Sequence, residues 1–237
     1  MSTKEAVAIL AGGVLVVSLL SNTKTTQATA ASPLANSAGT RPGLAPLTTT
    51  ADKTDARAMI TRLRIKTRGP GTGYERTKYG DNWADTADTV PYAHNGCRTR
   101  DDLLARDGTN LTYKPGSHCD IIALRLTDPY TGRTIDWHIS KADEIQVDHV
   151  VPLAYAWHMG ATHWSKTKRI DFANDPLELL PVDGAANEQK DAQGPANWLP
   201  PQKSIRCAYV TRFAQVALKY DLPVTKADKD TMLKQCR

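Results

Sequence analysis

Residues 144–201 decide the fold, and they read EIQVDHVVPLAYAWHMGATHWSKTKRIDFANDPLELLPVDGAANEQKDAQGPANWLPP. The short run at residues 145–147 predicts a strand, and this strand leads directly into Asp148 and His149. Because neighbouring side chains of a strand point to opposite faces, a carboxylate and an imidazole leave one backbone position in two directions. The two side chains can therefore do different jobs at one site.

A second strand and a helix follow within the same segment. The turn signal Asn-Asp-Pro at residues 174–176 precedes an apolar run at residues 177–182, and a helix that carries Asn187 comes next. A strand, a loop, a second strand and a helix form a compact frame that can bring Asp148, His149 and Asn187 together. Carboxylate and amide oxygens suit a hard divalent ion such as Mg²⁺. An imidazole beside such an ion is well placed to deprotonate water.

A β-hairpin is expected upstream of this segment. Apolar residues alternate with other residues over 120–126 and again over 134–139, and DPYTG at residues 128–132 joins the two runs. This alternation predicts two antiparallel strands with one buried face, and the joining sequence has the composition of a turn. The alternating apolar positions are Ile122, Leu124, Leu126, Ile135, Trp137 and Ile139.

Helices are expected near both ends of the folded part. Apolar residues at intervals of three and four predict a helix over 205–220, and Thr225 begins a sequence that resembles the capping box of a last helix. Residues 55–66 also place apolar side chains on one helix face. A short helix over 100–106 is expected, with Thr99 as its N-cap. The helix over 205–220 and the last helix are interpreted as scaffold.

The N-terminal part of the chain carries targeting information. A positive start is followed by an apolar run at residues 6–20 and by a small-residue site at residues 28–30, which is typical of a signal peptide. We therefore expect residues 1–30 to be cleaved, with an uncleaved anchor as the alternative. Residues 31–52 are rich in Ala, Ser, Thr, Pro and Gly without apolar periodicity, which predicts a disordered linker. Residues 53–237 remain as one domain.

Composition and cysteine content fit an exported globular protein. A hydrophobic content of 41% allows a real core, and the net charge of +5 is compatible with a polyanionic partner without indicating one. The four cysteines form no Cys-x-x-Cys pair, which argues against a zinc knuckle. Their number fits two disulfides in an exported protein. Three pairings are possible, and we expect the local one because each pair then brackets a contiguous unit. That pairing joins Cys97 to Cys119 and Cys207 to Cys236.

The ordered motifs resemble an HNH (ββα-metal, His-Me finger) endonuclease, specifically an exported branch related to the nuclease portion of GmrSD-type restriction enzymes. The resemblance rests on Asp148-His149 with Pro152, Asn174-Asp175-Pro176, Leu179-Leu180, Asp183-Gly184, Asn187-x-x-Lys190 and Trp198-Leu199-Pro200-Pro201. It extends upstream through Asn95-Gly96-Cys97 with Thr99-Arg100 and through DPYTG at residues 128–132. It implies an α+β fold in which a small antiparallel hairpin core and surrounding helices hold a ββα-metal finger at residues 144–201, with C-terminal helices over 203–237.

The resemblance also implies how the central residues act. His149 would be the general base that activates water, and Asp148 and Asn187 would hold one divalent cation, Mg²⁺ first and Mn²⁺ or another ion next. Asn187 departs from the eponymous pattern, which has histidine at this position, and the change favours a hard ion over Zn²⁺. The structural zinc site of four cysteines found in many HNH proteins is absent from this sequence, and the disulfides would take over its stabilising role.

Three further residues receive roles from the resemblance. Asn174 would order the loop and help to orient the histidine. Lys190 would contact phosphate, although an exposed helix lysine is often only solvated. Arg169 would also contact phosphate, or it would instead be paired within the protein.

The implied function is a secreted, metal-dependent endonuclease that hydrolyses DNA, with RNA as a second candidate substrate. Low sequence specificity is expected because no separate specificity domain is recognisable. The expected partner is nucleic acid, with no membrane after signal cleavage, no obligate protein partner and a monomeric state. The alternative is a non-catalytic module that uses the same finger to bind nucleic acid or metal. A Ser/His/Asp hydrolase is disfavoured because no Gly-x-Ser-x-Gly motif is present.

Overall fold

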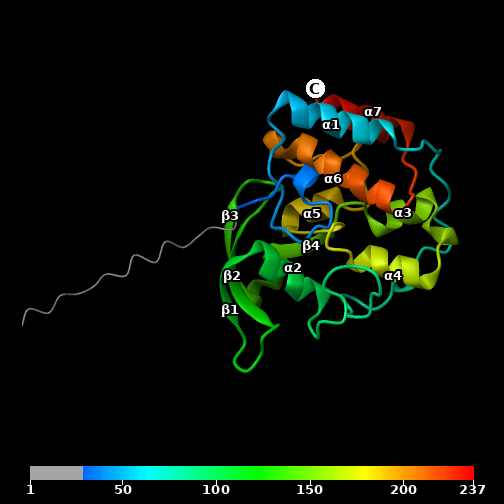
Figure 1. Cartoon of the computed structure of the whole chain (residues 1–237). Coiled ribbons are helices and arrows are strands. Elements are labelled where there is room, and N and C mark those ends of the chain that lie inside the picture. Colours follow the sequence, from blue (N-terminus) through cyan, green and yellow to red (C-terminus); the bar gives the residue numbers. More distant parts are fainter. Residues whose placement is uncertain (1–28) are drawn as a thin grey trace, which may run out of the picture.

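The computed structural model describes residues 29–237, which form the expected α+β fold (Figure 1). One sheet has the order β1-β2-β3, with strands Thr109–Tyr113, Ile121–Thr127 and Thr134–His138. The other pairs β4 (Ile145–His149) with β5 (Leu179–Asp183). The α-helices are α1 (Thr50–Thr61), α2 (Thr99–Asp107), α3 (Leu153–Met159), α4 (Lys166–Asn174), α5 (Gly184–Lys190), α6 (Arg206–Lys219) and α7 (Lys226–Gln235). Short 3-10 turns are η1 (Pro33–Ala35), η2 (Arg76–Tyr79), η3 (Ile139–Glu144), η4 (Ala161–His163) and η5 (Lys203–Ile205).

The predicted hairpin is present as β2 and β3, which pair antiparallel with Leu124 opposite Trp137 and Leu126 opposite Ile135. These apolar side chains are buried, as the alternation predicts. Strand β1 was not expected. It is polar and mostly exposed, and a register irregularity interrupts its pairing with β2, so it carries no alternating signal.

The strand, strand and helix order of the finger is confirmed. Strands β4 and β5 pair antiparallel, with Asp148 opposite Leu180 and His149 opposite Leu179. The connection between them, expected only as a loop, contains α3 and α4. Helix α5 follows β5 at once because the Asp183 side chain accepts a hydrogen bond from the backbone N–H of Ala186 at 3.0 Å and so caps its first turn.

Helix α6 lies at the centre of the main core, and α1 and α7 lie beside it (Figure 1). Its predicted apolar face is confirmed by the burial of Tyr209, Phe213 and Val216. The predicted cap of α7 is also present, since the Thr225 side chain accepts a hydrogen bond from the backbone N–H of Asp228 at 3.1 Å. The apolar packing of three helices therefore supports the finger from one side.

Both predicted disulfides are present. Cys207 is joined to Cys236, which ties the first turn of α6 to the residue after α7. Cys97 is joined to Cys119, which ties the loop before α2 to the segment before β2. The local pairing was therefore the right choice among the three.

The N-terminal expectation needs correction. Residues 31–52 are not a disordered linker, because Ala31, Leu44 and Leu47 are buried. Gly43 also donates its backbone N–H to the carboxylate of Asp107 at 3.0 Å. A few apolar side chains without periodicity are thus enough to pack a polar segment onto an existing core. The expected signal peptide falls almost entirely on residues 1–28, which lie outside the described residues.

Two helix boundaries also differ from expectation. Helix α1 starts at Thr50, where Thr49 caps it, and ends at Thr61, before the predicted end at residue 66. Thr99 lies inside α2 rather than capping it, and Arg98 takes the N-cap position without a side-chain cap bond. Between residues 29 and 237, none of the helices combines the length and apolar character needed to cross a membrane.

Candidate active site

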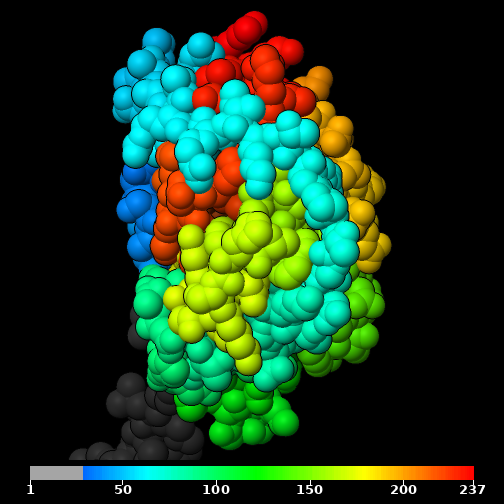
Figure 2. Space-filling model, turned by 90° about the vertical axis from the view of Figure 1, so that its right-hand side faces the viewer, coloured from blue at the N-terminus to red at the C-terminus, as the bar shows by residue number. Residues whose placement is uncertain are grey.

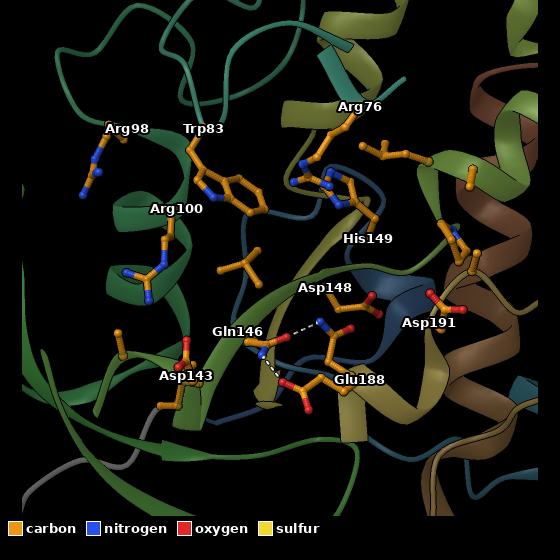
Figure 3. A pocket seen from close by; sticks show the side chains of 18 of the residues that line it. Arg76, Trp83, Arg98, Arg100, Asp143, Gln146, Asp148, His149, Glu188 and Asp191 are labelled. Atoms are coloured by element: carbon orange, nitrogen blue, oxygen red, sulfur yellow. Dashed lines mark hydrogen bonds between the residues drawn. The ribbon is translucent and has the colours of Figure 1, made fainter. Parts of the chain in front are cut away.

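One cleft of about 840 Å³ holds the residues that the sequence singles out (Figure 3). Asp148 and His149 reach it from the end of β4, and Asn187 reaches it from α5. Arg76 from η2 and Trp83 from the loop that follows line the same cleft. The expected meeting of Asp148, His149 and Asn187 is therefore confirmed.

The His149 ring is held on two sides. Its Nε2 lies 3.0 Å from the backbone oxygen of Ala173 at the end of α4. Because a carbonyl oxygen only accepts hydrogen bonds, Nε2 carries the hydrogen and Nδ1 keeps its lone pair. The Trp83 indole stacks on the imidazole with 5.5 Å between ring centroids and 13° between planes. The ring is thus fixed in one orientation and one tautomer.

The surroundings of His149 also keep it neutral. Burial lowers its pKa to about 3, the positive charges of Arg76 and Lys190 act in the same direction, and the bond to Ala173 opposes them. A histidine with so low a pKa is neutral at neutral pH and carries a single ring proton. His149 is therefore buried and uncharged, with its hydrogen on Nε2 and a lone pair on Nδ1.

Lowering the pH is expected to destabilise the protein through His149. An unfolded histidine titrates near 6.5, whereas folded His149 takes up a proton only at about 3. The unfolded chain therefore binds one more proton within this window. The free energy of unfolding should fall by about 1.4 kcal/mol per pH unit as the pH drops through it, and this contribution is absent above pH 6.5. Urea unfolding in EDTA at several pH values measures the slope. His149→Gln should lack this contribution, and equal slopes for both proteins would contradict the assignment.

Asp148 is held by two partners below the imidazole. Its Oδ1 accepts a hydrogen bond from Lys190 Nζ at 2.8 Å, and its Oδ2 accepts one from the Tyr130 hydroxyl. Lys190 also donates to the backbone oxygen of His149 at 2.7 Å. Burial raises the pKa of Asp148, and Lys190 and Tyr130 oppose that rise. The carboxylate is thus placed by a cation from α5 and a phenol from the β2–β3 turn.

The role expected for Lys190 needs correction, because its side chain is fully buried. The sequence around Lys190, a short and mostly polar helix, is typical of a solvated lysine. In the structure the Lys190 side chain reaches from α5 to β4 and neutralises Asp148. It therefore cannot reach a phosphate in this structure. It is a positioning residue for the strand end that carries Asp148 and His149.

Asn187 is oriented by a chain of amide contacts. Its Nδ2 donates to Gln146 Oε1 at 2.8 Å, and Gln146 Nε2 donates to Glu188 at 3.1 Å (Figure 3). This pairing uses the nitrogen of the Asn187 amide and leaves its oxygen as the free acceptor. Gln146 thus selects which end of the amide is available in the cleft.

The donor set of the cleft suits a hard divalent cation. Each oxygen of the Asp148 carboxylate accepts one hydrogen bond and has a second lone pair, and no donor from residues 29–237 is bonded to the Asn187 amide oxygen. Oxygen donors of this kind match Mg²⁺ better than Zn²⁺. The residues present therefore fit the metal that the sequence resemblance implies.

Two other expected site residues act at a distance from the chemistry. Asn174 bonds to the backbone oxygen of Ile170 at 3.0 Å, and it is the adjacent Ala173 whose carbonyl contacts His149. Asn174 thus orders the end of α4, and among residues 29–237 the imidazole donates its hydrogen bond to Ala173 instead. Arg169 donates to the backbone oxygens of Lys78 and Trp164, as in the paired alternative, and it is not among the residues that line the cleft.

The space-filling view shows the segment that follows α1 running down beside α3 and α4 (Figure 2). Arg169 of α4 donates to the backbone oxygen of Lys78 in η2, the turn that also contains Arg76. Trp83 has a positive φ of 58°, a rare conformation for a bulky residue. Sequence reasoning missed Trp83 and Arg76 because they lie in a loop-rich stretch without periodicity. It treated Tyr130 only as part of a turn.

Comparisons with known proteins show the family of this chain. Residues 98–235, more than half of the chain, match the family model of the C-terminal domain of GmrSD restriction endonucleases. A relative from Arthroderma benhamiae, named as an uncharacterized secreted protein, is 36% identical over 186 residues, which cover 76% of this chain and 84% of the relative. No solved structure matches. The matched region contains the β2–β3 hairpin, the whole finger and the two C-terminal helices, α6 and α7. The chain therefore belongs to the family of the GmrSD restriction endonuclease C-terminal domain.

Proposed function

We propose that this protein is a secreted, metal-dependent endonuclease that hydrolyses phosphodiester bonds of DNA, and secondarily RNA, with low sequence specificity. The observation that carries the proposal is a neutral His149, with Nδ1 free, in the same cleft as the oxygen donors of Asp148 and Asn187. The family match supports a nuclease-related activity. The relative's name and the two disulfides support secretion.

In the proposed reaction His149 Nδ1 takes a proton from the attacking water, while Nε2 stays bonded to Ala173. Trp83 holds the ring in place, and Lys190 aligns the neighbouring carboxylate of Asp148 and opposes the rise that burial causes in its pKa. Asp148 and Asn187 would hold one divalent cation, Mg²⁺ first, which when bound would withdraw charge from the scissile phosphate and stabilise the leaving oxygen. The protein would act as a monomer on nucleic acid, without an obligate protein partner.

The proposed function is tested by nicking of supercoiled plasmid. We expect the purified protein to nick plasmid DNA with Mg²⁺ or Mn²⁺, to stop in EDTA and to recover when Mg²⁺ is returned in excess. A parallel series with single-stranded RNA establishes the substrate range. If DNA and RNA both stay intact under every metal tried, the protein is instead a non-catalytic module, and binding of labelled nucleic acid would then identify it.

A further inference from the structure

Arginines line part of the cleft. Arg98 and Arg100 flank the start of α2, and Arg76 lies beside His149 (Figure 3). Asp143 and Glu188 line the same cleft. The cleft thus holds carboxylates suited to a cation and arginines suited to an anion.

Arg100 is the informative residue among these arginines. Its guanidinium is partly buried and lies 5.6 Å from the centre of the Trp137 ring. Burial lowers its pKa, the neighbouring Arg98 lowers it further, and Asp101 opposes both. None of the residues from 29 to 237 accepts a hydrogen bond from its side chain or forms an ion pair with it. A partly desolvated cation without an acceptor is stabilised when a ligand supplies an anion.

The neighbouring arginines, unlike Arg100, have hydrogen-bond acceptors within the protein. Arg98 is bound to the Asp101 carboxylate at 3.0 Å, and Arg76 donates Nε to Asn82 at 3.0 Å. Arg106, further along α2, donates to its adjacent carboxylate and to three backbone oxygens. Asp101 acts on Arg100 through its charge alone, because its hydrogen bond is made with Arg98. The donors of Arg100 therefore remain unused at the side of the cleft.

We propose that Arg100 binds a backbone phosphate of the nucleic acid other than the scissile one, so that the enzyme recognises a polynucleotide strand rather than an isolated phosphodiester. This inference rests on the proposed function. A guanidinium offers donors in a planar fork that matches two oxygens of a phosphate. Because Arg100 lines the cleft from α2, whereas Asp148 and Asn187 line it from β4 and α5, a strand can cross the cleft from Arg100 toward His149.

Binding without catalysis tests the subsite directly. The full chain, in EDTA, is titrated against fluorescent single-stranded and duplex 20-mers, and Arg100→Ala is compared with the wild type. The loss of one charge-assisted contact should raise Kd by about 10–100-fold on at least one of the two. The slope of log Kd against log salt should become shallower by about 0.7 for a single strand or 0.9 for a duplex.

Two further variants make the result specific. Arg100→Lys keeps the charge and should bind more tightly than Arg100→Ala, which separates phosphate recognition from a folding defect. Arg62→Ala is the matched control, since Arg62 is exposed at the end of α1 and does not line the cleft. Its Kd should stay within about twofold of the wild type. If Arg100→Ala binds both oligonucleotides as the wild type does, the subsite is overturned.

Cleavage separates this inference from the proposed function. For Arg100→Ala, the fall in kcat/KM on an oligonucleotide should exceed the fall on bis(p-nitrophenyl) phosphate, which has no flanking phosphate, by at least about tenfold. Equal falls on both substrates would place Arg100 at the scissile phosphate and overturn the subsite. If the wild type cleaves neither substrate, the nuclease proposal fails while the binding measurement still decides about Arg100.

Discussion

Replacing His149 with alanine is expected to lower the rate of phosphodiester cleavage by about 10²–10⁴-fold, the usual contribution of a general base. The buried imidazole is neutral, its Nε2 is committed to Ala173, and its Nδ1 is the nitrogen left to accept a proton. Initial rates of plasmid nicking in saturating Mg²⁺, at one salt concentration, measure the loss. The residual rate should still depend on metal, because Asp148 and Asn187 are unchanged.

A second histidine provides the control for this variant. His158 also places a ring nitrogen against a backbone oxygen, that of Gly69 at 2.8 Å, but it does not line the cleft. His158→Ala removes a similar contact and should keep most of the nuclease activity. Near-UV circular dichroism of both variants reports whether the aromatic packing is intact. If His149→Ala, correctly folded, nicks plasmid at the wild-type rate, another group is the base.

Replacing Lys190 with methionine is expected to reduce the free energy of unfolding by about 3–5 kcal/mol, because it leaves the Asp148 carboxylate buried without its cation. Methionine fills much of the space of the lysine stem, so the loss reports the charge and the two hydrogen bonds more than the volume. The pKa of Asp148 should rise further, since Lys190 opposes the effect of burial on it. Urea unfolding at pH 7 in EDTA measures the change.

A double variant separates the ion pair from general damage to the core. Asp148→Asn removes the uncompensated charge, so Lys190→Met combined with Asp148→Asn should be more stable than Lys190→Met alone. An exposed pair, Lys226 with Asp230 on α7, serves as the comparison, and Lys226→Met should change stability far less. A small effect of Lys190→Met, comparable to that of Lys226→Met, would show that the buried pair does not hold β4 and α5 together.

The elements that the sequence predicts well are those defined by near neighbours in the chain. The hairpin, the strand that ends in Asp148 and His149, and the helix that carries Asn187 follow from alternation and turn signals. The cap of α7 at Thr225 likewise needs only four consecutive residues. Local pairing of the cysteines belongs to the same class, since each disulfide closes a short stretch of chain.

The sequence by itself therefore determined the order of the finger and supplied candidates for its general base and its metal ligands. Only the tertiary structure decided which distant side chains complete the site. Trp83 stacks on a histidine from another segment, and Lys190 is buried because Asp148 lies across from it. Such contacts depend on how separate elements pack, and no periodicity in the chain records them. The same reason explains why Arg100, on a helix visible in the sequence, is recognisable as unpaired only within the folded cleft.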